Sequence, residues 1–178
     1  KFMMPEYKSN PSKEKINSIK LIGMNKKINL EREIAESHGN NIARWLTALP
    51  ANKLDALNYI DLLSKLSNDL NWELTVHKTE ELKTMGAGAF LAVSQGNEDD
   101  SAAIVRIKFK PHNKEAKKTL SLVGKGIIFD TGGSNLKPFN SMLDMHIDMG
   151  GSAVALGTLL AITKLNLPIE VDCWLAIT

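Results

Sequence analysis

The sequence predicts an α/β fold, a three-layer α/β/α domain built on a mostly parallel or mixed central sheet. Two observations predict this class. Candidate strands and helices alternate along most of the chain, and the strands are short apolar runs flanked by glycine, proline and charged residues. The composition agrees with a packed domain, because 43% of the 178 residues are hydrophobic and 24% are charged.

The first part of the chain differs in composition from the rest. Residues 1–15 contain Pro5, Pro11 and several lysines without an apolar period, so we expect a loop or linker there. Residues 18–24 have the apolar content of a short strand. We therefore place a boundary near residue 33, with residues 1–33 as a linker and tail and 34–178 as the main domain.

The next elements follow from hydrophobic periodicity. Apolar residues recur three or four positions apart over 29–49 and 54–70, which predicts two helices, the second amphipathic. Gly39 is expected to weaken the middle of the first helix. Apolar and polar residues alternate over 72–76, which predicts a strand, and a short helix is expected over 79–85.

Three further strands are expected over 90–94, 102–109 and 119–129, each an apolar run of strand length. The polar segments between them, 96–100 and 110–114, are interpreted as solvated hairpin loops.

The chain then returns to a helix and a strand. Gly150 and Gly151 precede a helix over 152–165 that is apolar on nearly every side, so it should be buried on more than one face. Pro168 precedes the last strand, 169–177.

Charge and cysteine content exclude some classes of protein. The net charge is +2, from 22 Lys and Arg against 20 Asp and Glu, which does not indicate a nucleic-acid surface. Cys173 is the one cysteine, so no internal disulfide can form, and its apolar neighbours predict burial. No signal peptide and no run of about eighteen apolar residues is visible, so we expect a soluble, cytoplasmic protein.

Glycines and charged residues concentrate between Gly124 and Gly151, which hold six of the twelve glycines. This density is typical of backbone that approaches a ligand closely. A phosphate-binding loop is not favoured, because Gly124-Lys125-Gly126-Ile127 lacks the Walker order of residues. The dinucleotide-binding fingerprint fails as well, since three apolar residues follow Gly126.

Asp130 and Asp148 stand at the edges of apolar segments, where a carboxylate needs a partner. A divalent cation is one such partner. Two ordinary alternatives remain open: Asp130 as a turn carboxylate and Asp148 as a helix N-cap, or ion pairs of both with Lys125 and Lys137.

The string from Val123 to Pro138, followed by Asp148-Met-Gly-Gly151, resembles the leucyl aminopeptidase family, the dinuclear metallo-aminopeptidases also called cytosol aminopeptidases. The segments 48–53 and 85–96 are similar to the same family. The resemblance covers roughly residues 34–178, so this part is identified as the N-terminal part of the family's catalytic domain. Residues 1–33 would be the tail of a missing N-terminal domain.

The resemblance implies a site for two divalent metal ions, Mn²⁺ or Zn²⁺, with Mg²⁺ a further candidate. It assigns Lys125 as a metal ligand through its neutral amine, Asp130 as the bridging carboxylate and Asp148 as a ligand of one metal. Lys137 would be catalytic, its ammonium group polarising the scissile carbonyl. His146 is expected to be no ligand, and Met142, Met145 and Met149 are interpreted as packing residues.

The resemblance also implies the activity: hydrolysis of the N-terminal peptide bond of peptides, with a preference for apolar N-terminal residues such as leucine. It implies a homo-oligomer, a hexamer, in the cytoplasm, with no membrane partner and no expected DNA partner. The family supplies two more carboxylate ligands and an arginine from a later segment, so this chain is expected to be inactive alone. The alternative is a non-catalytic DNA-binding or assembly module that retains the motif.

Overall fold

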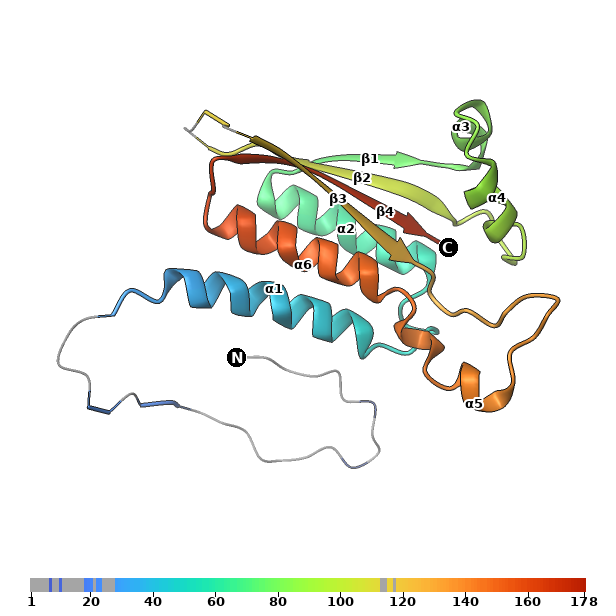
Figure 1. Ribbon diagram of the computed structural model, residues 1–178, viewed down its shortest axis with the longest axis horizontal. Helices are drawn as coiled ribbons and strands as arrows, with labels where there is room; N and C mark the ends of the chain where they lie inside the picture. Colours follow the sequence, from blue (N-terminus) through green and yellow to red (C-terminus); the bar gives the residue numbers. More distant parts are fainter. Residues whose placement is uncertain are drawn as a thin grey trace.

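The chain forms a four-stranded mixed sheet with helices packed against it, as seen in a computed structural model (Figure 1). The structure describes residues 7, 10, 18–20, 22–23, 28–112, 115–116 and 118–178. The strands are β1 (Glu73–His77), β2 (Ala103–Phe109), β3 (Lys118–Gly126) and β4 (Ile169–Ile177), in the spatial order β1-β2-β4-β3. The predicted α/β class with a mixed sheet is confirmed; parallel pairing is confined to β3 and β4, and the other two pairs are antiparallel.

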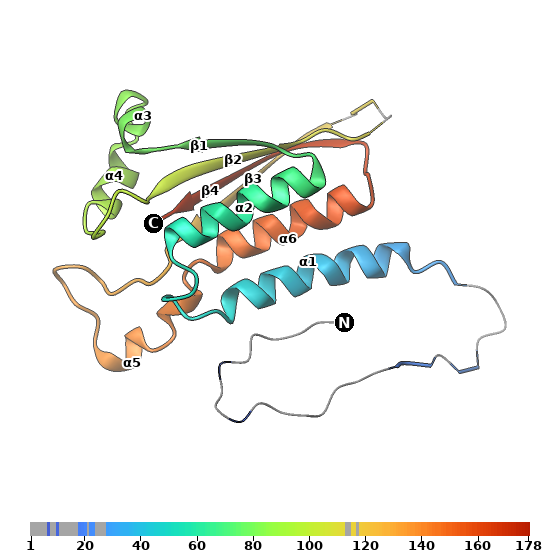
Figure 2. The same ribbon diagram turned by 180° about the vertical axis from the view of Figure 1, so that it is seen from behind.

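Three long helices build the main core: α1 (Glu31–Thr47), α2 (Ala56–Leu70) and α6 (Gly150–Lys164). Helix α2 lies against β1 and β2, α6 lies against β3 and β4, and α1 packs on α6. Both views show these helices on one side of the sheet (Figures 1 and 2). Within the part of the chain that the structure describes, the opposite face of the sheet carries no helix, so two of the three expected layers are seen.

The helix boundaries follow local chemistry. Asp55 caps α2, because its carboxylate accepts a hydrogen bond of 2.7 Å from the backbone N–H of Asn58. Helix α6 begins directly after Met149 and is buried on several sides, as its all-round apolar sequence predicts. The predicted long helices and the strands over 72–76, 102–109 and 169–177 are confirmed to within three residues at each end.

The prediction of a strand over 90–94 is wrong. Residues Gly88–Ser94 form the short helix α4, which follows α3 (Thr79–Thr84) and packs against it at one end of the sheet (Figure 1). A run of five apolar residues does not distinguish strand from helix, and Ala89, Leu91 and Ala92 are strong helix formers.

Three further expectations need correction. The segment 110–114 does not join a hairpin, because β4 lies between β2 and β3 and pairs with both; its residues 113 and 114 lie outside the described residues. Strand β3 ends at Gly126, three residues before the predicted end. No strand forms in residues 18–20 and 22–23, and the rest of the expected strand over 18–24 lies outside the described residues.

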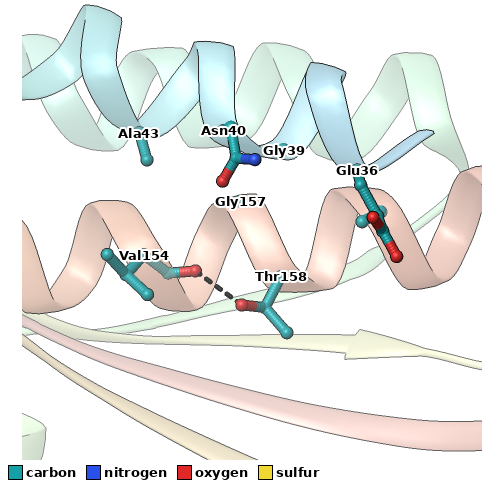
Figure 3. Close-up of a pocket in the computed structure, with 8 residues that line it drawn as sticks. Glu36, Gly39, Asn40, Ala43, Val154, Gly157 and Thr158 are labelled. Atoms are coloured by element: carbon teal, nitrogen blue, oxygen red, sulfur yellow. Dashed lines mark hydrogen bonds between the residues drawn. The ribbon is translucent and has the colours of Figure 1, made fainter. Parts of the chain in front are cut away.

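Gly39 has a packing role that outweighs its low helix propensity. A Cβ atom at Gly39 would stand 2.3 Å from the carbonyl oxygen of Gly157, and one at Gly157 would stand 2.5 Å from the oxygen of Gly39. Helices α1 and α6 therefore cross with their backbones in contact. Beside the crossing lies a surface cavity of about 340 Å³, bordered by Asn40, Val154 and Thr158 (Figure 3).

The segment Phe139–Lys164 is long and apolar enough to cross a membrane by length and composition alone. It contains α6, which packs between α1 and the sheet. Eight residues of α6 are buried there, so its apolar composition is explained by its position in the core.

Cys173 lies on the inner face of β4 and is fully buried, as predicted. Burial raises the pKa of its thiol to about 12. We expect the folded chain not to react with Ellman's reagent at pH 8, and to react fully in urea. The unfolded thiol ionises near pH 8.5 and the folded one does not, so this group's contribution to stability is lost as the pH rises from there towards 12. Rapid labelling of the native protein would contradict the buried position.

Candidate metal centre

The glycine-rich segment connects the carboxyl end of β3 to the amino end of α6. It runs through an extended loop, the short helix α5 (Phe139–Met142) and a single 3₁₀ turn, Met145–Ile147 (Figure 1). Lys125 is the penultimate residue of β3, and Asp148 ends the 3₁₀ turn two residues before α6. Both therefore lie at the edge where parallel strands of α/β proteins commonly hold ligands.

The structure brings all four predicted site residues together as two ion pairs. Lys125 Nζ lies 2.9 Å from Asp148 Oδ2, and Lys137 Nζ lies 3.0 Å from Asp130 Oδ2. The ion-pair alternative raised by the sequence is thus confirmed. It does not exclude cation binding, because each ammonium occupies a position next to a carboxylate where positive charge is stabilised.

A turn holds Asp130 and Lys137 in place. Asp130 Oδ1 accepts a hydrogen bond of 2.8 Å from the backbone N–H of Gly132, and the N–H of Lys137 donates to the carbonyl of Thr131 at 2.9 Å. Gly132 has a φ of +92°, and a Cβ there would meet the carbonyl oxygen of Asn135 at 2.5 Å. Glycine is therefore required at this position, and the turn-carboxylate interpretation of Asp130 is confirmed.

Close backbone packing holds the two ends of the segment together. A Cβ at Gly124 of β3 would stand 2.5 Å from Ser152 Cα, and one at Gly151 would stand 3.0 Å from the backbone nitrogen of Lys125. The start of α6 therefore lies directly on β3, and Asp148 is brought to Lys125. The N-cap interpretation of Asp148 is wrong, because Met149 occupies the N-cap position of α6.

The electrostatics link the four residues into one cluster. The hydrogen bond from Lys137 lowers the pKa of the Asp130 carboxyl below its usual value, the N–H of Gly132 lowers it further, and the charge of Lys125 adds to the effect. Asp130 is thus ionised at neutral pH, and the charges of both lysines stabilise its carboxylate.

The donors present fit a divalent cation. Asp148 Oδ2 is buried, and the ammonium of Lys125 lies 2.9 Å from it. A buried carboxylate oxygen needs a cationic partner, and a metal ion could take the place of the ammonium. Two carboxylates and one amine make an incomplete set, and the described residues contain no cluster of three or more His, Cys, Asp and Glu side chains that could hold a metal.

Met145 contacts Lys137, which the sequence did not predict. Its Sδ atom lies 3.4 Å from Lys137 Nζ, whereas Met149 is fully buried and packs as predicted. The recurrence of methionines at intervals of three and four was visible in the sequence, but only the 3₁₀ turn decides which of them faces the lysine.

Comparison with known proteins identifies the family of the chain. The profile of the cytosol aminopeptidase family, catalytic domain, matches residues 41–178. A probable cytosol aminopeptidase of Stutzerimonas stutzeri is 43% identical over 139 residues, which are 78% of this chain and 28% of the relative.

Solved structures show the same likeness. The apo leucyl aminopeptidase of Trypanosoma cruzi is 32% identical to this chain, with a TM-score of 0.73. The match covers 80% of this chain and 27% of the Trypanosoma cruzi chain. The bottromycin maturation enzyme BotP, solved in complex with Mn, is 28% identical to this chain, with a TM-score of 0.75. That match covers 83% of this chain and 31% of the BotP chain. The chain spans less than a third of each of these three proteins.

The matched profile covers the segment that carries both ion pairs, and the structural neighbours share its fold. The chain therefore belongs to the cytosol aminopeptidase family.

Proposed function

We propose that Lys125, Asp130, Lys137 and Asp148 form part of a dinuclear metal centre that hydrolyses the N-terminal peptide bond of peptides, with a preference for apolar N-terminal residues such as leucine. The observation that supports it most directly is the buried Asp148 Oδ2 paired with Lys125, in a cluster that also contains the second carboxylate. Zn²⁺ and Mn²⁺ are the cations that we propose, and the Mn complex of BotP supports the second.

Each residue has a distinct part in this proposal. Asp130 and Asp148 would hold the ions through their carboxylate oxygens, and Lys125 would bind through its neutral amine, which it presents only after losing a proton. Divalent cations bound there would supply Lewis acidity towards the scissile carbonyl and activate water.

Lys137 keeps its proton in this proposal. Its side chain is 28% exposed, and its ammonium lies near Asp130 and Met145. With cations bound at Asp130, the attraction of that carboxylate for Lys137 would fall, and the ammonium would be available to the oxyanion that develops on the substrate carbonyl.

The test uses a chain extended by the remaining residues of the family's catalytic domain. We expect leucine p-nitroanilide to be hydrolysed, the activity to disappear after EDTA treatment, and Mn²⁺ or Zn²⁺ to restore it. N-acetyl-leucine p-nitroanilide is the matched control and should not be cleaved, because an aminopeptidase requires a free amino terminus. The 178-residue chain alone is expected to show little or no turnover.

Two outcomes would count against this function. Equal cleavage of the acetylated substrate would exclude an aminopeptidase. No turnover by a folded, metal-loaded extended chain would favour the non-catalytic DNA-binding or assembly module instead. A net charge of +2 gives little electrostatic attraction to DNA, so this outcome would favour the assembly module over DNA binding.

We also propose that the complete protein is a cytoplasmic homo-oligomer, a hexamer. The name cytosol aminopeptidase borne by the relatives supports the location. Apolar side chains exposed on α1 and α6, Ile34 and Val154, support contacts with other subunits. Light scattering of the complete protein measures the oligomeric state.

A further inference from the structure

Ser152 and Tyr59 form a buried hydrogen-bond relay below the candidate site. Ser152 Oγ lies 2.7 Å from the carbonyl oxygen of Met149, and the Tyr59 hydroxyl lies 3.0 Å from Ser152 Oγ. Both side chains are fully buried. A carbonyl can only accept, so Ser152 uses its one proton on Met149, and Tyr59 must be the donor to Ser152. The relay thus runs in one direction, from α2 to the start of α6.

The relay ends at the residue next to Asp148. Met149 follows Asp148, and Gly151 packs on the backbone of Lys125, so the segment 148–152 lies between β3 on one side and Tyr59 on the other. Motion at the start of α6 would therefore change the distance between Asp148 and Lys125.

A relay of hydroxyls is unusual in this core. Among the described residues, only Ser67 and Ser152 are buried and polar by type, and the neighbours of Ser152 along α6 are apolar. Phenylalanine and alanine would fill the same space without hydrogen-bonding groups to satisfy. A buried polar pair of this kind fixes one geometry, since each partner is costly when left without the other.

We propose that Tyr59 and Ser152 are positioning residues, which hold Asp148 in register with Lys125 so that the two can bind one cation. This inference rests on the proposed metal centre. Burial also raises the pKa of Tyr59 far above its usual value, so its hydroxyl remains a donor at every pH of interest.

The same helix supplies a matched control. Trp72 Nε1 donates to Thr163 Oγ1 at 2.9 Å, and Thr163 Oγ1 donates to the carbonyl of Leu159 at 2.9 Å. This second relay ties the other end of α6 to the sheet and contacts none of the four site residues. Its loss should affect stability without affecting the site.

The experiment compares Tyr59→Phe, Ser152→Ala, their double variant and Thr163→Val in the 178-residue chain. Mn²⁺ alone is titrated by calorimetry, thermal unfolding is followed by circular dichroism, and amide hydrogen exchange is measured over 148–153. Each relay variant should bind Mn²⁺ about tenfold more weakly, the lower end of the loss seen when groups that orient metal ligands are removed. The double variant should lose little more, because the two hydroxyls act as one unit.

Thr163→Val should lower the melting temperature as well, yet leave Mn²⁺ affinity within about twofold, since sites without shared partners act independently. Unchanged Mn²⁺ affinity in Tyr59→Phe, or an equal loss in Thr163→Val, would overturn the inference.

Failure of the metal centre itself would be recognised separately. If neither the unmodified 178-residue chain nor the extended chain binds Mn²⁺, the proposed metal centre is wrong, and hydrogen exchange alone tests the positioning role of the relay. Faster exchange over 149–153 in Tyr59→Phe than in Thr163→Val would then support its positioning role, and equal rates would overturn it.

Discussion

Replacing Lys137 with alanine is expected to lower the kcat of the extended chain towards leucine p-nitroanilide by about 10²- to 10³-fold, with a smaller change in KM. Losses of this size follow the removal of one group that stabilises a developing oxyanion. The Lys137 side chain is largely buried, and its ammonium lies near Asp130 and Met145. The other lysine of the cluster, Lys125, pairs with Asp148 and so does not replace it.

The affinity for Mn²⁺ distinguishes a loss of catalysis in Lys137→Ala from a loss of the metal site. Lys137→Ala removes a cation that competes for Asp130, so Mn²⁺ should bind at least as tightly as before, whereas Asp148→Ala should weaken it. Lys83→Ala is the matched control, because Lys83 makes an exposed ion pair with Glu80 outside the site. Full activity in Lys137→Ala would show that the pair with Asp130 serves structure alone.

Replacing Gly124 with alanine is expected to lower the free energy of unfolding by about 3 kcal/mol, the upper part of the range for overpacked sites. The added methyl would stand 2.5 Å from Ser152 Cα and 2.9 Å from the carbonyl oxygen of Gly151. All of these atoms are backbone, so β3 and the start of α6 must separate. Urea unfolding measures the change, and Mn²⁺ titration should show weaker binding, because Asp148 would move from Lys125.

Gly88→Ala is the control for this substitution. Gly88 begins α4, and nothing lies within 4 Å of a Cβ built on it. Its replacement should leave stability unchanged or raise it by less than about 1 kcal/mol, since alanine is the better helix former. A Gly124→Ala variant as stable as Gly88→Ala would mean that the contact between β3 and α6 is loose.

Much of the fold could be predicted from local sequence. Apolar spacing of three and four residues identified α1 and α2, a run apolar on nearly every side identified α6, and alternation identified β1. The prediction was wrong at 90–94, where a short apolar run forms α4, because both periods fit so few residues. It was also wrong about the connection between β2 and β3, because which strands pair depends on contacts distant in sequence.

The candidate site, like the fold, could be predicted only in part from local sequence. Lys125, Asp130, Lys137 and Asp148 were found from their order and their glycines, because the segment between β3 and α6 is continuous in sequence. Their roles as metal ligands and catalyst stay predictions. The sequence did not show which lysine pairs with which aspartate, since this depends on the turn at Gly132 and on the 3₁₀ turn before Asp148.

The sequence by itself determined the class of fold, the three long helices and the family motif, because each depends on residues close together along the chain. Only the tertiary structure decided that β4 lies between β2 and β3, that α1 and α6 meet at Gly39 and Gly157, and that Tyr59 supports the segment of Asp148. Tyr59 and Ser152 are 93 residues apart, and no local pattern reports a hydrogen bond between residues so distant; packing of α2 and α6 under one sheet brings them together.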